Sequence, residues 1–256
     1  MNSFQVKNER ITNKNIVKSF DGKNVLENIS ASIQEGEFVS FVGPSGCGKS
    51  TLLNMIANVE KPTSGNVMYK DKQVQVQDVV SYMPQQDLLL PWRSALQNIV
   101  LPLEIEGKPK KQRLTEGMEA LKQFELDEYA DHYPDELSGG MRQRISFLRT
   151  YLCEKPIMLL DEPFGKLDAF TKMEVHSWLL NSWHQEKQTI VMVTHDLDEA
   201  ILLSDRVFIL SQRPASIVGE VQVKLPRPRT MDMLTSLELK KDKEEILSVL
   251  APYMKK

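Results

Sequence analysis

The stretch of sequence that decides the fold reads Gly43-Pro44-Ser45-Gly46-Cys47-Gly48-Lys49-Ser50. An apolar segment, Glu37–Val42, precedes it and is predicted to be a strand. The segment that follows, Lys49–Val59, places its apolar residues on one face of a helix. Glycines let backbone N–H groups turn inward around an anion, and the N-terminus of the next helix adds positive charge. This glycine pattern, followed by lysine and serine between a strand and a helix, predicts a phosphate-binding loop.

A loop of this kind predicts a nucleotide and a metal ion as ligands. Lys49 would neutralise the β- and γ-phosphates, and the Ser50 hydroxyl would bind Mg²⁺, so ATP and Mg²⁺ are the expected cofactors. Thr51, next along the helix, joins the nucleotide-binding candidates. Cys47 lies inside the loop and is interpreted as a small filler residue, the alternative being a redox switch. A chance glycine-rich turn is the other explanation of the loop, and its strand-then-helix context argues against it.

A second motif is predicted to place two carboxylates beside this loop. The apolar run Ile157–Leu160 ends in Asp161 and Glu162, as expected for a buried strand whose end reaches the active site. Consecutive residues of a strand point to opposite faces, so the two acids need different roles. We expect Asp161 to bind the metal ion and Glu162 to act as the base that orients and polarises the attacking water. On its own, the pair would equally fit a solvated turn.

Strands and helices alternate along most of the chain. Short strands are expected before Gly36, and strands at Val79–Met83, Ile190–Thr194 and Val207–Leu210, with helices at Phe170–Trp183, Leu197–Leu203 and Leu239–Val249. Such alternation predicts a mostly parallel sheet with helices on both faces. A stretch rich in helices, Leu96–Arg149, interrupts the alternation and reads as an inserted lobe.

Composition narrows the functional class. A net charge of −3 and a pI near 5.9 give no electrostatic attraction to nucleic acid, so none is expected as a partner. The longest apolar runs are too short to cross a bilayer. Met1–Gln5 lacks the basic and apolar pattern of a signal peptide. Two cysteines cannot form a disulfide framework, and a cytoplasmic location is expected.

A third motif, Leu137-Ser138-Gly139-Gly140-Met141-Arg142-Gln143-Arg144, resembles the signature sequence of ABC ATPases and, as in that family, precedes the Asp161-Glu162 pair. The resemblance runs from about Ile16 to Gln212. It implies an α/β fold with a P-loop NTPase (RecA-like) core, an antiparallel β subdomain and an inserted helical subdomain. All of 1–256 would then be one ABC ATPase domain. It would comprise a core at about 4–86 and 151–212, a helical part at 87–150 and a tail at 213–256.

The resemblance also implies a homodimer that forms on ATP binding. In the family, two such domains join head to tail, each ATP lying between one P-loop and the partner's signature sequence. Ser138, Gly139 and Gly140 would then contact the γ-phosphate bound by the other subunit. A hydroxyl and glycine N–H groups before a helix are a reasonable anion site. Read without the resemblance, the same residues are a helix N-cap with turn glycines.

Four more residues match positions of the family by their local sequence. Gln85 resembles the glutamine that contacts Mg²⁺ and water, and His195 the histidine that holds the γ-phosphate and the attacking water. Phe20 resembles the aromatic residue that stacks on adenine, and Asp168 the aspartate at the dimer interface. The chain departs from the family at Lys166, where a small residue is commoner.

One segment points to a class of transporter. Leu88, Leu89, Leu90, Pro91 and Trp92 form an apolar stretch that resembles the permease-docking segment of importers of the nitrate, sulfonate and taurine type, with thiamine-precursor importers among their relatives. The segment Leu225–Arg229 also resembles that group. The resemblance implies integral membrane permease subunits as partners, an extracytoplasmic solute-binding protein acting indirectly, and a place on the cytoplasmic face of the membrane.

Two alternatives to an importer remain. ABC proteins of DNA repair and chromosome structure carry long coiled coils between the two motifs. Here about ninety residues separate Lys49 from Ser138, with prolines and no sustained heptads. Translation factors of the family carry two motif sets, and this chain carries one. An ATPase serving efflux or lipid or lipoprotein extraction would have the same catalytic motifs, so only the Leu88–Trp92 resemblance favours import.

Overall fold

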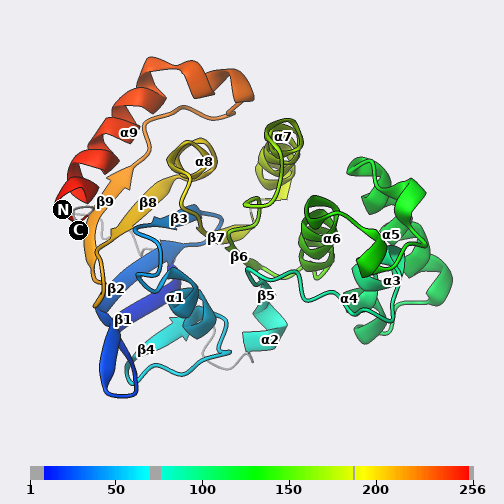
Figure 1. Cartoon of the computed structure of the whole chain (residues 1–256), viewed down its shortest axis with the longest axis horizontal. Coiled ribbons are helices and arrows are strands. Elements are labelled where there is room, and N and C mark those ends of the chain that lie inside the picture. Colours follow the sequence, from blue (N-terminus) through cyan, green and yellow to red (C-terminus); the bar gives the residue numbers. More distant parts are fainter. Residues whose placement is uncertain (1–8, 70–75, 187, 254–256) are drawn as a thin grey trace, which may run out of the picture.

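The computed structural model describes residues 9–69, 76–186 and 188–253, and the predicted N-terminal boundary at residue 4 lies outside them. Its first strands form an antiparallel sheet with the order β2-β1-β4 (Figure 1). These strands are β1 (Glu9–Phe20), β2 (Lys23–Gln34) and β4 (Ser64–Tyr69). The prediction of short strands before Gly36 is wrong, because β1 and β2 each run for 12 residues. The turn between them is tight, with positive φ at Asp21 and Gly22.

A second sheet of six strands has the order β5-β6-β7-β3-β8-β9. All neighbouring pairs are parallel except β8 and β9, which run antiparallel. Its strands are β3 (Phe38–Val42), β5 (Val80–Met83), β6 (Ile157–Asp161), β7 (Thr189–Val193), β8 (Arg206–Leu210) and β9 (Ile217–Gln222). Every residue of β3, β6 and β7 is buried, which explains why these strands are short apolar runs rather than alternating ones. The predicted mostly parallel sheet is confirmed.

Apolar layers cover the two faces of this sheet. On one face, Val39 and Phe41 pack with α1 (Lys49–Ile56) and the antiparallel sheet. On the other, Phe38 and Val42 pack with residues of α7 (Ala169–Glu186) and α8 (Leu197–Leu203). Figure 1 shows α1 on one side of the strands and α7 and α8 on the other.

The middle of the chain is helical, as predicted. Figure 1 shows α3, α4, α5 and α6 gathered at one end of the molecule, beyond β5 and β6. Their bounds are α3 (Ala95–Ile99), α4 (Leu101–Ile105), α5 (Lys110–Gln123) and α6 (Gly139–Tyr151). A capping box on Ser94 starts α3, and Pro109 is the N-cap residue of α5. The remaining short elements are α2 (Val76–Val79), η1 (Asp127–Tyr129), η2 (Pro134–Glu136), η3 (Met231–Thr235) and η4 (Ala251–Tyr253).

The tail is tied to the core by two arginines and ends in α9 (Leu237–Leu250). The guanidinium of Arg229 is buried and donates to the carbonyl oxygens of Ile201, Leu202 and Ser204, which end α8. Arginine thus satisfies carbonyl groups that a helix end leaves unpaired. Arg227 lies 3.8 Å from the ring centre of Trp183. Across the described ranges we find no helix that is both long and apolar enough to cross a membrane.

Candidate nucleotide-binding site

A cavity of about 360 Å³ lies where β3, β6 and β7 end. Parallel strands carry their carboxyl ends to the same edge of a sheet, and the loops that follow them meet there. The structure therefore brings together most of the residues that the sequence analysis selects. The cavity is lined by Ser45, Gly46, Gly48, Lys49, Ser50, Thr51, Gln85, Glu162, His195 and Arg213.

The glycine-rich loop turns back on itself between β3 and α1. Gly46 and Gly48 have φ values of 73° and 120°, in the left-handed region that residues with a Cβ rarely adopt. The Lys49 ammonium donates to the carbonyl oxygens of Gly43 and Pro44, both at 2.9 Å. The lysine is therefore held over its own loop, where its charge faces the space that a phosphate group would fill.

Asp161 ends β6 as a buried carboxylate, only 2 % exposed. Burial raises its pKa to about 6, against a smaller lowering by a hydrogen bond with Ser50. Its Oδ1 is buried without a hydrogen-bond partner. A buried carboxylate oxygen that lacks a partner, beside a hydroxyl group, fits a hard cation such as Mg²⁺, which prefers oxygen ligands.

Glu162 has an unusual backbone, with a φ of 48°. For a residue with a Cβ this conformation costs roughly 1 kcal/mol and persists only where neighbours hold it. Here the N–H of Glu162 donates to the Val193 carbonyl at 2.9 Å, and the Gln143 side chain donates to the Glu162 carbonyl at 2.9 Å. Glu162 lies just past the end of β6, so the strand alternation used in the sequence analysis does not extend to its side chain.

The Glu162 carboxylate lies between two of the predicted catalytic residues. Gln85 donates from Nε2 to Glu162 Oε2 at 3.1 Å. His195 Nδ1 lies 3.4 Å from Glu162 Oε1. Gln85 follows β5 and His195 follows β7, the strands that lie on either side of β6 in the sheet. Three polar side chains therefore converge in the cavity beside the phosphate-binding loop. This arrangement can bind and orient a water molecule.

Cys47 is a residue of the phosphate-binding loop, and its side chain is buried. Burial raises the pKa of its thiol, so the reactive thiolate is disfavoured at neutral pH. This agrees with a filler residue and argues against a redox switch.

Several predicted site residues do not line this cavity. Phe20 ends β1 and is about half exposed, beside the ammonium of Lys18. Ser138 is the N-cap residue of α6 and accepts a hydrogen bond from the N–H of Met141. Gly139 and Gly140 form the start of that helix. Asp168 accepts hydrogen bonds from the N–H groups of Phe170 and Thr171, and so caps the start of α7.

Asp87 lies beside the signature sequence on α6, beside Lys166 and directly before the apolar stretch that begins at Leu88. Its carboxylate lies 3.2 Å from Arg142 Nε on α6 and 3.9 Å from the Lys166 ammonium. Arg149, also on α6, donates to the Asp87 and Leu88 carbonyls. The N–H of Lys166 donates to Gln143 at 2.7 Å, the same side chain that holds the Glu162 backbone. Lys166, at which the chain departs from the family, is thus joined to the segment that precedes Leu88.

The apolar stretch after Asp87 divides into exposed and buried residues. Leu88 and Trp92 are 57 % and 71 % exposed, whereas Leu89 is buried in the core. The sequence analysis includes Leu89 in the docking segment, but its side chain is buried and does not form part of the exposed surface. The positive φ of Leu88 bends the chain there and turns consecutive leucines in different directions.

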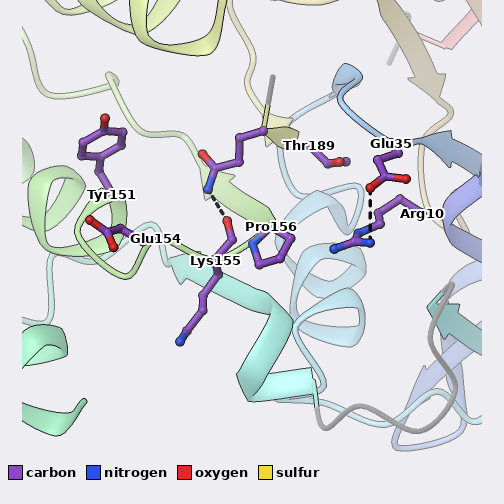
Figure 2. A pocket seen from close by; sticks show the side chains of 8 residues that line it. Arg10, Glu35, Tyr151, Glu154, Lys155, Pro156 and Thr189 are labelled. Atoms are coloured by element: carbon purple, nitrogen blue, oxygen red, sulfur yellow. Dashed lines mark hydrogen bonds and ion pairs between the residues drawn. The ribbon is translucent and has the colours of Figure 1, made fainter. Parts of the chain in front are cut away.

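A second cavity, of about 460 Å³, lies at the amino ends of β6 and β7, away from the strand ends that form the first. Figure 2 shows Arg10 and Glu35 on one of its sides and Tyr151 and Glu154 on the other. None of the predicted site residues lines it. Its charged groups are largely paired, Arg10 with Glu35 at 3.6 Å and Lys155 with Glu106 at 2.8 Å.

The raised pKa of Asp161 gives a prediction for folding stability in the absence of metal. The folded state binds this proton more tightly than the unfolded state, whose carboxyl has the ordinary value near 3.8. Stability therefore falls as the pH rises from about 4 to about 6 and stays lowered above that range. We expect Asp161→Asn, measured by denaturant unfolding with a chelator present, to be about 3 kcal/mol more stable than wild type at pH 8.

This gain should vanish below about pH 3, where the carboxyl is protonated in both states. The exposed carboxylate of Asp232, changed to asparagine, is the matched control and should show no such difference. A pH-independent effect of Asp161→Asn would mean that the buried charge is not its cause.

Comparison with known proteins agrees with this geometry. The model of the ABC transporter family matches residues 26–165. The chain is 44 % identical over 228 residues to the formylaminopyrimidine import ATP-binding protein ThiZ of Halalkalibacterium halodurans, covering 87 % of this chain and 90 % of that protein. It is 40 % identical over 218 residues to the aliphatic sulfonates import ATP-binding protein SsuB of Bacillus cereus, covering 85 % and 86 %.

Its structure is similar to that of the ATP-binding cassette MJ0796, solved as a dimer in a post-hydrolysis state with ADP and Pi. The TM-score is 0.78 at 32 % identity, and the match covers 84 % of this chain and all of that one. The family model spans more than half of the chain and the relatives most of it. The chain therefore belongs to the ABC transporter family and is one of its ATP-hydrolysing, ATP-binding proteins.

Proposed function

We propose that this chain is the nucleotide-binding subunit that powers a membrane importer of a small solute. The observation that carries the proposal is the Glu162 carboxylate, which lies between Gln85 and His195 at the mouth of a phosphate-binding loop. The import function of its relatives, named for formylaminopyrimidine and aliphatic sulfonates, supports the direction of transport. A solute of that kind is proposed here too.

ATP would occupy the loop Gly43–Gly48, with Lys49 on its β- and γ-phosphates and Thr51 close by. The Asp161 oxygen that lacks a partner supports Mg²⁺ binding, with the Ser50 hydroxyl and Gln85 as the other protein groups. A bound Mg²⁺ would neutralise the charge that develops on the phosphates. Phe20 is proposed to contact the adenine ring, a stacking contact worth about 1 kcal/mol.

Hydrolysis would depend on Glu162 as the base. Its carboxylate would accept a proton from the attacking water, while Gln85 and His195 fix the direction of its oxygens. His195 is exposed, so it remains free to contact the γ-phosphate as well. The backbone bend at Glu162 aims the carboxylate into the cavity instead of along β6.

A homodimer is proposed as the hydrolysing form, with Ser138, Gly139 and Gly140 facing the partner's nucleotide and Asp168 at the interface. No steric contact within the chain requires glycine at these two positions. A Cβ on Gly140 would meet its nearest atoms at 3.5 Å, and one on Gly139 at 4.0 Å. Glycine within a helix costs up to about 1 kcal/mol relative to alanine. Close approach of another molecule explains both residues, and the dimeric form of MJ0796 supports this reading.

Gly140→Ala should therefore separate folding from function. The variant is expected to be as stable as wild type or more so, by up to about 1 kcal/mol, because helix propensity improves and the added methyl group meets no clash. ATP-dependent dimerisation, followed by size-exclusion chromatography with multi-angle scattering, should weaken about tenfold or more, and hydrolysis with it.

Thr115→Ala on the exposed face of α5 serves as the control and should leave dimerisation unchanged. If Gly140→Ala formed ATP-dependent dimers as wild type does, Gly140 would not lie in the dimer interface.

The permease is proposed to dock against the exposed side chains Leu88 and Trp92, from the cytoplasmic face of the membrane. An exposed leucine and tryptophan on a short bent segment suit a helix of a partner protein. The Asp87 contacts join this segment to α6, whose first residues are the proposed signature sequence. An extracytoplasmic solute-binding protein would act on the same machine indirectly.

Affinity purification from gently solubilised native membranes tests the importer proposal. We expect an integral membrane protein to copurify at about one copy per copy of this chain. The double variant Leu88→Ser/Trp92→Ser should lose at least tenfold of that partner while keeping basal ATPase activity. The matched control is Ile105→Ser, which alters a side chain that is 78 % exposed at the end of α4.

If the double variant recovered the same permease, the docking surface would not be formed by Leu88 and Trp92. If soluble proteins or nucleic acid copurified and no membrane protein did, the importer proposal would be wrong. The assignment of ATPase activity would be unaffected. An efflux or lipid-extraction permease would identify the other membrane alternative.

A further inference from the structure

We propose that Arg213, from the loop after β8, binds the phosphate chain of the nucleotide. The inference rests on the proposed ATP site and adds a residue to it. Arg213 lines the same cavity as Lys49 and Glu162. Every other residue that lines this cavity belongs to a motif identified in the sequence, whereas Arg213 comes from the loop after β8. No sequence motif marks it.

The loop that carries Arg213 is pressed against the phosphate-binding loop. The Leu210 carbonyl, at the end of β8, would lie 2.8 Å from a Cβ on Gly43, so only glycine permits this approach. Gly43 therefore has a second role beside its place in the motif. It lets β8 bring the next residues close to the first residue of the phosphate-binding loop.

The same loop is held rigidly at both ends. The N–H of Ser211 donates to the Ser216 carbonyl at 3.0 Å, and the N–H of Ser216 to the Ser211 hydroxyl at 3.0 Å. The buried residue Ala215 exchanges two backbone hydrogen bonds with β2, donating to Val25 at 2.9 Å and accepting from Glu27 at 2.8 Å. A loop pinned in this way presents Arg213 at a fixed place and loses little entropy when a ligand binds.

The Arg213 side chain has the charge and freedom that a phosphate contact needs. It is exposed, and within the described parts of the chain its guanidinium forms no hydrogen bond or ion pair. The Lys49 ammonium, in contrast, is already held by two carbonyl oxygens. Burial raises the pKa of the Cys47 thiol, and the Arg213 charge opposes this, which places the guanidinium near the loop. Guanidinium groups pair with phosphate oxygens in a two-pronged geometry.

Titration calorimetry with a non-hydrolysable ATP analogue and Mg²⁺ tests the assignment on the full chain. We expect Arg213→Ala to bind about fivefold more weakly than wild type, the effect of losing one partly exposed charged hydrogen bond. Arg213→Lys should recover part of the affinity because it restores the charge. Gln212→Ala, which alters the exposed neighbour in the same loop, should bind as wild type does.

Salt dependence distinguishes a phosphate contact from a contact with the base. The ratio of the wild-type and Arg213→Ala affinities should shrink between about 50 mM and about 300 mM sodium chloride, since salt screens exposed charges. A ratio that does not change with salt would assign Arg213 to the base or sugar and overturn the proposal. So would Arg213→Ala affinity within twofold of wild type at low salt.

Lys49→Ala in the same series separates this inference from the proposed function. If Lys49→Ala loses binding while Arg213→Ala keeps it, the Arg213 assignment fails and the ATP site stands. If the wild type itself binds no analogue, the proposed function fails.

Discussion

Glu162→Gln is expected to lower ATP hydrolysis by about 10²- to 10⁴-fold while leaving ATP binding close to wild type. The substitution keeps the size and hydrogen-bonding capacity of the side chain and removes its ability to accept a proton. Gln85 and His195 retain a partner at nearly the same place. Bound ATP then persists, and the proposed ATP-bound dimer should accumulate. Phosphate release measures the rate, and scattering of the eluted species measures the dimer.

The exposed residue Glu128, changed to glutamine, is the control for this measurement and should turn over normally. Hydrolysis by Glu162→Gln within about threefold of wild type would exclude Glu162 as the base. Loss of hydrolysis together with loss of ATP affinity would mean that Glu162 holds the nucleotide rather than the water.

Lys49→Ala is expected to weaken ATP binding by about 100-fold or more, because several charge-assisted hydrogen bonds to phosphate disappear at once. Hydrolysis should be lost with it. The Gly43 and Pro44 carbonyls also lose their donor, so the empty loop is expected to be looser. Nucleotide titration together with a thermal unfolding curve separates a lost ligand contact from a lost fold.

Lys14→Ala, an exposed lysine on β1, controls for the removal of one positive charge from the protein. It should bind ATP as wild type does. Unchanged ATP affinity in Lys49→Ala would overturn the nucleotide site as a whole, because this ammonium is the main positive charge facing the loop.

The core of the candidate site could be predicted from the sequence because it depends on local patterns and one topological rule. Short apolar runs before Gly43, Asp161 and His195 predict buried parallel strands, and parallel strands bring their carboxyl ends together. Gln85, after β5, follows the same rule. The pattern needs no knowledge of distant contacts, and the structure places Lys49, Gln85, Glu162 and His195 around one cavity.

The features that the sequence analysis misses depend on partners far along the chain. Lys18 is buried in β1, where the sequence pattern favours an apolar residue. Its ammonium can be buried because it donates to Glu60 and to the Lys61 carbonyl, far along the sequence. Buried Arg229 is explained only by the end of α8. Arg213 reaches the cavity through contacts of its loop with β2. The burial of Leu89 follows from a bend in an irregular segment, where no periodicity indicates which side chain faces inward.

The left-handed backbone at Glu162 has a consequence for attempts to make this protein more heat resistant. Glycine or asparagine tolerates a φ of 48° far better than glutamate does, so a chain selected for folding alone would carry one of them there. Laboratory evolution that rewards thermal resistance and ignores turnover should therefore find substitutions of residue 162 early. Each such gain would remove the carboxylate that the proposed hydrolysis uses as its base.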